Sequence, residues 1–347
     1  MSAEMPSAPP MPNPGEIFAA FTAFHHTGAL KAAIELDLFS TISAGAHTVD
    51  DLARHCGTAS RGMRILADYL TANGFLTKDG SGPGARYELT PATAIFLDRS
   101  SPAFMGCAID FLASPMMIEA FTNVAGAVRK GGAVGVDGDV LAPDHEIWVK
   151  FARAMGPTSL FVARLLAIAL DAAAGAPWKV LDVAAGHGMF GITLAGENPN
   201  AQIVALDWAN VLEVAKENAR AAGVQDRLRT IAGSAFEADL GSGYDLVLLP
   251  NFLHHFDVAT CETFLRRVHQ ALKPGGRAVT IEFTPDDNRV TPVIPASFAL
   301  VMLVTTPAGD AYTTAELERM ATHAGFARSE VRDLAPSFHK AVISYKA

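Results

Sequence analysis

The 347-residue sequence predicts an α/β fold, a doubly wound sheet in its C-terminal half, preceded by a mostly helical domain of winged-helix type. Three observations favour this. Short apolar runs rich in β-branched residues alternate with helical patterns after residue 176, at the spacing of βαβ units. The first run breaks into a glycine-containing turn. Near the N-terminus, two helical patterns are followed by a hairpin signal.

The glycine turn follows the first predicted strand, which covers residues 180–183. Gly186 and Gly188 remove Cβ atoms where the chain must approach a ligand, and the next helix offers unpaired N–H groups. Asp207 ends the next strand, at the position where doubly wound sheets bind ribose hydroxyls. A glycine turn alone also occurs for packing reasons, but with Asp207 it predicts a nucleoside-bearing cofactor.

The rest of this half continues the alternation. The predicted strands cover residues 202–206, 228–232, 244–250, 276–283 and 341–345, and the predicted helices cover 210–222, 258–272 and 313–324. Residues 233–236 and 249–256 follow two of these strands directly. Because open α/β sheets bind ligands at the carboxyl ends of their strands, both segments are expected to line a site.

The N-terminal part reads as a tail and a small domain. Residues 1–14 are rich in Pro, Ser and Ala, and we expect them to be disordered. Residues 14–42 carry a broad apolar helical face, which suits either a partner surface or ordinary core. Helices opening at Thr48 and Ser60, then two short strands around residues 80–84, give the winged-helix order over residues 15–100.

A winged helix raises the question of DNA binding, and charge argues against it. Residues 1–100 hold seven basic and ten acidic side chains, and the whole chain has a net charge of −9. A DNA-binding surface needs a basic stripe. We therefore expect no nucleic-acid partner and assign this domain to dimerisation and to covering an active site.

The remaining composition favours a cytoplasmic enzyme without a membrane partner. The three cysteines, Cys56, Cys107 and Cys261, are widely spaced and are expected to be reduced, buried thiols. Neither a signal peptide nor an uncharged apolar run of membrane-spanning length is evident. Residues 101–175 are predicted to be a helical linker that covers the substrate, and residues 176–347 to be the catalytic domain.

His254 and Glu282 are the chemically suggestive pair. Both lie at the ends of successive predicted strands, so they can meet. A histidine can take a proton from a hydroxyl near neutral pH, and a carboxylate beside the ring would fix its tautomer. A structural histidine is the equal alternative from spacing alone. A metal site from His254, His255 and Glu282 is less favoured, because the spacing of metal ligands is missing.

The ordered motifs resemble those of class I S-adenosylmethionine-dependent methyltransferases, which have a Rossmann-like sheet. The motifs are DVAAGHG (182–188), DW (207–208), GSAF (233–236), LHHF (253–256), LKPGG (272–276) and Glu282. With the winged-helix front end, the chain from about residue 15 resembles the small-molecule O-methyltransferases of plant caffeic-acid and bacterial natural-product metabolism, which implies a homodimer.

The resemblance implies how the cofactor is held. Asp182, Gly186 and Gly188 would cradle the methionine end, Asp207 the ribose, and Trp208 the adenine. The other implied cofactor contacts are Ala184, where glycine is common, Ser234, where an adenine-binding acid is usual, and Gly233, Ala235, Phe236, Asn251 and Ser159.

The resemblance also assigns His254 as catalytic base and Glu282 as the carboxylate beside it. A second family acid would fall at Ala311, where only the neighbouring Asp310 could stand in, and the usual Asp after the base is His255. The implied or apolar substrate-binding candidates are Phe111, Trp148, Phe151, Met155, Phe298 and Met302.

The sequence thus predicts transfer of a methyl group from S-adenosylmethionine to a hydroxyl of a small aromatic or polyketide-like molecule, leaving S-adenosylhomocysteine, with no metal. C- or N-methylation, or a reaction in which the cofactor transfers no methyl group, stays open as an alternative. A cofactor-binding winged-helix regulator is a further one. The acceptor itself is not identified.

Overall fold

The computed structural model describes residues 13–135 and 146–347. The chain divides after Gly106 into two compact units. Residues 1–12 of the expected tail, and residues 136–145 of the predicted helical linker, lie outside the described residues.

The first unit has the predicted order of helices followed by a hairpin. The antiparallel hairpin pairs β1 with β2, so that Leu76 lies opposite Leu89. The Thr48 hydroxyl caps the helix Val49–His55 by accepting the Asp51 N–H at 3.3 Å. The elements are α1 (Gly15–Phe21), α2 (Phe24–Glu35), α3 (Leu38–Ser43), α4 (Val49–His55), α5 (Ser60–Ala72), β1 (Leu76–Asp79), η1 (Gly82–Gly84), β2 (Arg86–Leu89) and α6 (Pro91–Phe96).

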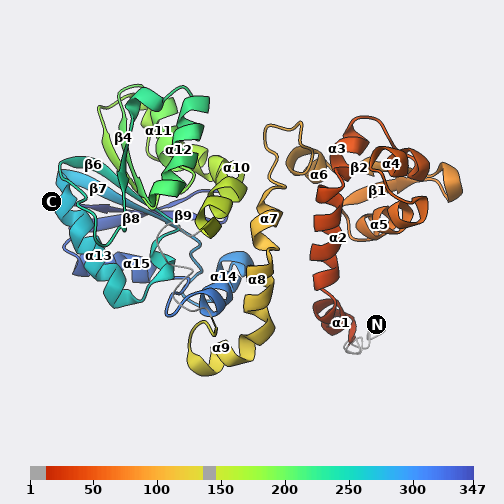
Figure 1. Cartoon of the computed structure of the whole chain (residues 1–347). Helices are drawn as coiled ribbons and strands as arrows, with labels where there is room; N and C mark the ends of the chain where they lie inside the picture. Colours follow the sequence, from red (N-terminus) through yellow and green to blue (C-terminus); the bar gives the residue numbers. More distant parts are fainter. Residues whose placement is uncertain (1–12, 136–145) are drawn as a thin grey trace, which may run out of the picture. The chain divides into compact units, whose positions relative to one another are not determined.

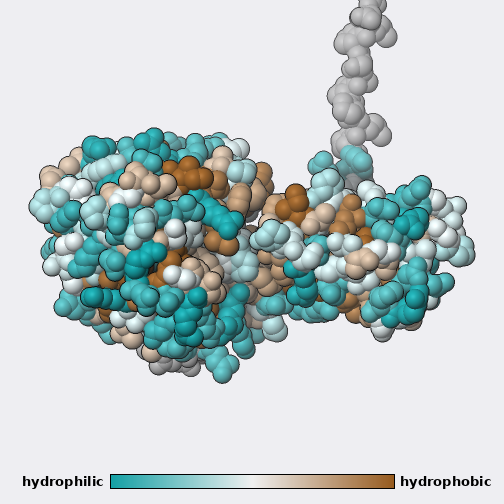
Figure 2. Space-filling model, turned by 90° about the horizontal axis from the view of Figure 1, so that it is seen from above, coloured by the Kyte–Doolittle hydropathy of each residue, from teal (hydrophilic) through white to brown (hydrophobic). Residues whose placement is uncertain are grey.

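The broad apolar face near the N-terminus divides into two parts. Leu38 and Phe39 of α3 are fully buried core residues. On α1 and the first turn of α2, large apolar side chains are 58–70% exposed, and these are Ile17, Phe18, Phe21 and Phe24. Figure 2 shows hydrophobic patches interrupting the mostly hydrophilic surface of the molecule.

The second unit opens with helices and continues into the α/β part. Its first elements are α7 (Ala108–Leu112), α8 (Pro115–Ala120), η2 (Phe121–Asn123), α9 (Val124–Lys130), α10 (Glu146–Ala169) and η4 (Ala172–Ala174). The strands are β3 (Lys179–Val183), β4 (Gln202–Asp207), β5 (Leu228–Ala232), β6 (Tyr244–Pro250), β7 (Leu272–Glu282), β8 (Arg328–Asp333) and β9 (Lys340–Tyr345). The remaining helices are α11 (Met189–Glu197), α12 (Ala209–Ala221), η5 (Gln225–Arg227), η6 (Leu253–His255), α13 (Val258–Ala271), α14 (Val293–Thr305) and α15 (Thr314–His323).

The seven strands form one mixed sheet in the order β5-β4-β3-β6-β7-β9-β8. The first five are parallel, and β9 is antiparallel to both β7 and β8. Helices α10, α11 and α12 lie on one side of the sheet and α13 and α15 on the other (Figure 1). The reversal of strand order between β3 and β6 creates the edge at which such sheets bind ligands.

Helices α8, α9 and α14 gather beside the sheet (Figure 1). The backbone joins the loop after α9 to the loop after α14, because Ala133 N–H donates to the Thr306 carbonyl at 2.9 Å. A Cβ on Gly132 would lie 2.2 Å from the Pro307 carbonyl oxygen, so this approach requires glycine. The region predicted to cover the substrate is therefore attached to the α14 loop.

Among the described residues, α10 is the one helix long and apolar enough to cross a membrane, judged by length and composition alone. Core helices of soluble proteins pass the same test, so this is weak evidence. Here α10 packs on α11 and α12, and Arg153 pairs with Glu217 of α12 at 2.9 Å.

Candidate active site

The turn after β3 has a left-handed backbone at three positions. The φ angles are +49° at Ala184, +57° at Gly186 and +73° at Gly188. Glycine adopts this region freely, whereas alanine there costs about 1 kcal/mol. Ala184 therefore carries local backbone strain next to the proposed ligand.

Asp182 lies just before this turn and is 1% exposed. One carboxylate oxygen, Oδ2, accepts the Gly191 N–H of α11 at 3.0 Å, while Oδ1 is buried without a partner. A Cβ on Gly191 would lie 3.0 Å from Oδ2 and 2.6 Å from Ile203, so glycine permits this approach. Burial, with a smaller contribution from the negative charge of Asp207, raises the pKa of Asp182 to about 7.

Asp207, at the end of β4, reaches the same turn. Its Oδ2 accepts the Gly186 N–H at 2.7 Å, and its Oδ1 accepts the Trp208 N–H at 2.7 Å. Burial raises the pKa of this carboxyl to about 6, although both hydrogen bonds act in the opposite direction. The structure thus brings together the turn and the acid that the sequence singled out separately.

The segments after β5 and β6 differ in their backbone conformation and in the polar and apolar groups that they present. Gly233 has a φ of +140°, and the Ser234 hydroxyl accepts the Phe236 N–H at 3.2 Å. Ala235 is buried, and Phe236 belongs to an aromatic cluster with ring-centroid distances of 4.9 to 6.0 Å, formed with Phe252, Phe256 and Phe264. Asn251 has a φ of +52° and a buried side-chain oxygen without a partner.

Glu282 and His254 meet, as predicted, at the ends of β7 and β6. His254 Nδ1 lies 2.5 Å from Glu282 Oε2, and the side chains are 6% and 2% exposed. The other oxygen, Oε1, accepts the backbone N–H groups of Phe252, Leu253 and His254 at 3.0, 2.9 and 3.3 Å. One carboxylate therefore holds both the backbone turn and the imidazole that the turn carries.

A second segment, residues 309–312, contacts the turn that carries His254. Asp310 N–H donates to the His254 carbonyl at 3.0 Å, and Tyr312 Oη donates to the Phe256 carbonyl at 2.5 Å. A Cβ on Gly309 would lie 2.2 Å from the His254 carbonyl oxygen. The role of Gly309 was not predicted, because a single glycine in a loop gives no signal of a contact 55 residues away in the chain.

Asp310 was predicted as a possible substitute for the missing second acid. Its carboxylate instead pairs with Arg289 at 3.0 Å, and Arg289 also binds Glu316 through both carboxylate oxygens at 2.6 and 2.7 Å. The contact of Asp310 with the His254 turn runs through its backbone N–H. A catalytic role for its carboxylate stays a prediction.

A continuous series of ring contacts surrounds the two histidines. Phe111 and Phe151 have centroids 4.9 Å apart, Phe151 and Trp148 6.1 Å, and Trp148 and His255 6.3 Å. On the other side, Phe298 presents an edge-to-face contact to His254 at 4.8 Å. Four of the predicted substrate-binding side chains therefore contribute rings to this series around His254 and His255, which we call the aromatic wall.

The other candidates on helices lie as follows. Met155 and Ser159 of α10 are half-buried and flank Gly156, whose Cβ position lies 3.6 Å from His187 of the glycine turn. Met302 of α14 is 4% exposed and belongs to the interior. Trp208 and Trp148 both pack against one small buried cluster, formed by Ala152, Val211 and Val214.

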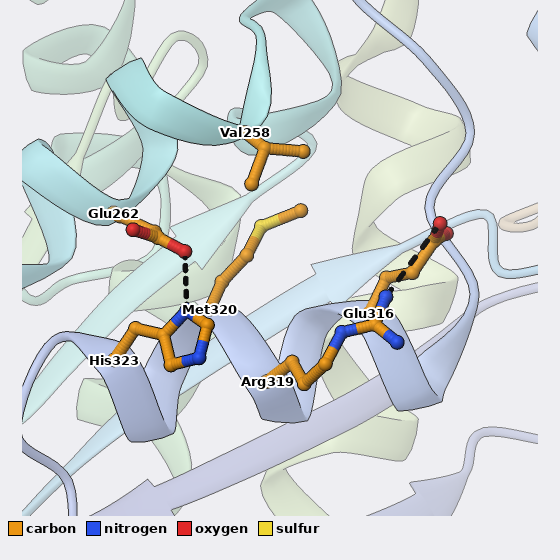
Figure 3. A pocket seen from close by; sticks show the side chains of 6 residues that line it. All are labelled: Val258, Glu262, Glu316, Arg319, Met320 and His323. Atoms are coloured by element: carbon orange, nitrogen blue, oxygen red, sulfur yellow. Dashed lines mark hydrogen bonds and ion pairs between the residues drawn. The ribbon is translucent and has the colours of Figure 1, made fainter.

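A separate small cavity of about 70 Å³ lies between α13 and α15 (Figure 3). Its lining includes the ion pair between His323 Nδ1 and Glu262 Oε1 at 2.7 Å. None of its residues comes from the carboxyl ends of the parallel strands. Within the described ranges, no group of three His, Cys, Asp or Glu side chains could hold a metal ion.

The fold and the arrangement of the site residues define the class of protein. A sheet of this order, with acids at the ends of β3 and β4 and a histidine after β6, is typical of class I S-adenosylmethionine-dependent methyltransferases. The residues fit that cofactor: the carboxylates of Asp182 and Asp207 have no ion-pair partner among the described residues, and Asn251 has an unpaired oxygen. The cofactor carries a sulfonium, an ammonium and ribose hydroxyls that could use them.

Two family models match the chain, an O-methyltransferase domain over residues 122–327 and an O-methyltransferase dimerisation domain over residues 18–99. The chain therefore belongs to the O-methyltransferase family. It is an S-adenosylmethionine-dependent enzyme that methylates a small molecule.

Named relatives of the chain are also O-methyltransferases. The chain is 31% identical to the 3-hydroxy-5-methyl-1-naphthoate 3-O-methyltransferase of Streptomyces sahachiroi, over 90% of this chain and 88% of that one. It is 29% identical to the tetracenomycin polyketide synthesis 8-O-methyl transferase TcmO of Streptomyces glaucescens, over 93% and 94%. A crystal structure of a candidate O-methyltransferase from Nostoc punctiforme, 49% identical, superposes with a TM-score of 0.90 and covers 97% of this chain and 100% of that one.

Proposed function

We propose that His254 is the general base in methylation of an aromatic or polyketide-like hydroxyl, and that Glu282 orients it. The observation that carries the proposal is the 2.5 Å contact between His254 Nδ1 and Glu282 Oε2, buried at the edge of the sheet where ligands bind. A carboxylate oxygen accepts hydrogen bonds, so Nδ1 bears the proton in the neutral ring. The other nitrogen, Nε2, is then a lone-pair acceptor that can take a hydroxyl proton.

Apart from proton transfer, the protein contributes mainly by positioning the reacting groups. The bound cofactor supplies an activated methyl group, so much of the rate should come from holding the reacting atoms in line. Glu282 contributes by fixing the turn that carries His254, since three backbone N–H groups and the imidazole share its two oxygens. After proton transfer, the same carboxylate would stabilise the imidazolium.

We assign the cofactor contacts to the turn and strand ends. Asp182, Gly186 and Gly188 would hold the methionine end, and Asp207 the ribose hydroxyls. Buried carboxylates without cationic partners support this, because such groups are costly unless a ligand compensates them. Trp208, Ala184, Asn251, Ser159 and the segment 233–236 remain proposed contacts on the same side.

The acceptor class rests on the aromatic wall and on the relatives. Flat rings pack well against edge and face contacts of the kind formed by Phe151, Trp148 and Phe298. The two Streptomyces relatives are named for a naphthoate and a polyketide. The helical region predicted to cover the substrate, residues 101–175, supplies three of the rings of this wall, Phe111, Trp148 and Phe151.

His254→Ala tests the base. We expect the methyl-transfer rate on a phenolic acceptor to fall by about 10²- to 10⁴-fold. The dissociation constant for S-adenosylhomocysteine, measured by calorimetry, should change little, because the His254 side chain contacts Glu282 rather than the glycine turn. His323→Ala removes another carboxylate-paired histidine and serves as the control. An unchanged rate in His254→Ala rules out the base role.

We further propose that the protein is a homodimer joined through its first unit. The match to a dimerisation domain and the exposed apolar side chains of α1 and α2 support this. Phe18→Glu combined with Phe21→Glu should shift the mass measured by light scattering from dimer to monomer. A monomeric wild-type protein contradicts the proposal.

The three cysteines are free, though only Cys261 is fully buried, which suits a reducing compartment such as the cytoplasm.

A further inference from the structure

His255 is the residue after the proposed base, and the proposed reaction assigns it no role. Its ring lies 4.3 Å, centroid to centroid, from the ring of His254, with 36° between the planes. It also closes the aromatic wall, since Trp148 contacts it edge to face. The two histidines therefore stand side by side next to the wall where an aromatic acceptor is expected.

The hydrogen bonds fix the tautomer of both rings. His255 Nδ1 lies 3.2 Å from the Phe252 carbonyl oxygen, which can only accept, so Nδ1 carries the proton. His254 Nδ1 faces the Glu282 carboxylate and is protonated for the same reason. Each ring consequently presents Nε2 as a lone-pair acceptor, and neither Nε2 has a hydrogen-bond partner among the described residues.

The two rings differ in how they respond to protons. Burial, and secondarily the nearby His254, lower the pKa of His255 to about 3. His255 therefore stays neutral across the working range of pH and keeps its acceptor nitrogen. Two neighbouring acceptors beside an apolar wall are satisfied best by two neighbouring donors on one flat molecule.

We propose that the acceptor carries a second hydroxyl next to the one that is methylated, and that His255 Nε2 accepts its hydrogen bond. The first hydroxyl lies at His254 and the second at His255, so the substrate class is an ortho- or peri-dihydroxylated aromatic. This rests on the proposed function, because it assumes that His254 faces the reacting hydroxyl.

Binding to the enzyme loaded with S-adenosylhomocysteine tests the proposal without any turnover. The ligands are 2-naphthol, 2,3-dihydroxynaphthalene, and 2,6-dihydroxynaphthalene, whose second hydroxyl is on the far ring. We expect the 2,3-isomer to bind about tenfold more tightly than the other two, which is the effect of one good hydrogen bond. Equal binding of the three, or equal tightening by the 2,6-isomer, overturns the proposal.

Variants then identify the residue. His255→Phe keeps a ring but removes the acceptor, so the three ligands should bind with equal affinity. His255→Asn offers an acceptor oxygen and should restore part of the preference. His323→Phe makes the same change in the cavity of Figure 3 and should keep the full preference. A preference that persists in His255→Phe refutes the assignment.

Two readouts separate this inference from the proposed function. Affinity for S-adenosylhomocysteine and the melting temperature establish that each variant is folded and loaded. If His254→Ala methylates at the wild-type rate while the preference for the 2,3-isomer stands, the base assignment fails and the second-hydroxyl site survives. If His254→Ala is inactive but the preference is absent, the opposite holds.

Discussion

Asp182→Asn is expected to stabilise the cofactor-free protein near pH 8 while weakening cofactor binding. The folded-state pKa of Asp182 is about 7, against 3.8 for the ordinary carboxyl. A folded pKa above the unfolded one means that ionisation costs stability: the cost is absent below about pH 4 and complete above about pH 7. At about 1.4 kcal/mol per tenfold difference in proton affinity, the full cost is about 4 kcal/mol.

Asparagine removes that cost but introduces another. One of its polar atoms can face the Gly191 N–H, as Oδ2 does now, while the other occupies the place of the unpaired Oδ1. Leaving a buried amide group unpaired costs about 1 to 3 kcal/mol. The net gain near pH 8 is therefore about 1 to 3 kcal/mol, or roughly 3 to 10 °C in melting temperature for a unit of this size.

Thermal denaturation of wild type and variant, near pH 4 and pH 8, measures the effect. The variant should melt higher than wild type near pH 8 and no higher near pH 4, where the wild-type carboxyl is neutral. With S-adenosylmethionine added, the wild type should gain more than the variant, because only the wild type keeps the carboxylate. A variant that is equally destabilised at both pH values refutes the reasoning.

Three further outcomes follow from the site. Affinity for S-adenosylmethionine should rise from pH 5 to pH 8 in calorimetry, as Asp207 and Asp182 ionise with pKa values of about 6 and 7, and a flat profile contradicts this. Ala184→Gly should raise the free energy of unfolding by up to about 1 kcal/mol in denaturant titration, because φ is +49°; a loss of stability argues against strain at this position. Gly309→Ala should lower the methylation rate and leave cofactor affinity unchanged, because its Cβ would displace the His254 carbonyl. Full activity of this variant would show that the contact of Gly309 with the His254 turn does not support catalysis.

The parallel part of the fold was predictable because its strands are short apolar runs bounded by turn residues. The same logic places their carboxyl ends at one edge, which is why the contact of His254 with Glu282, and that of Gly186 with Asp207, could be expected from residues far apart in the sequence. The three backbone N–H groups held by Glu282 could not, because they depend on the local path of the turn.

Two elements escaped the sequence patterns for opposite reasons. Strand β8 (Arg328–Asp333) lies at the sheet edge and is largely polar, so it lacks the apolar run of a central strand. Helix α14 (Val293–Thr305) is apolar nearly all round, which hides the helical period. The left-handed backbone of Asn251 and the contact of Gly309 are likewise set by tertiary packing.

Helix α10 has a consequence for the order of events in catalysis. It runs for 24 residues, about 36 Å, with Trp148 and Phe151 near one end and Gly156 against His187 of the cofactor turn one to two turns later. Because α10 contacts both regions, we expect filling of the cofactor turn and filling of the aromatic wall to be energetically linked. Linkage is reciprocal: each ligand should tighten the other by the same factor. The methyl donor would then act as an assembly factor for the acceptor pocket as well as a reagent.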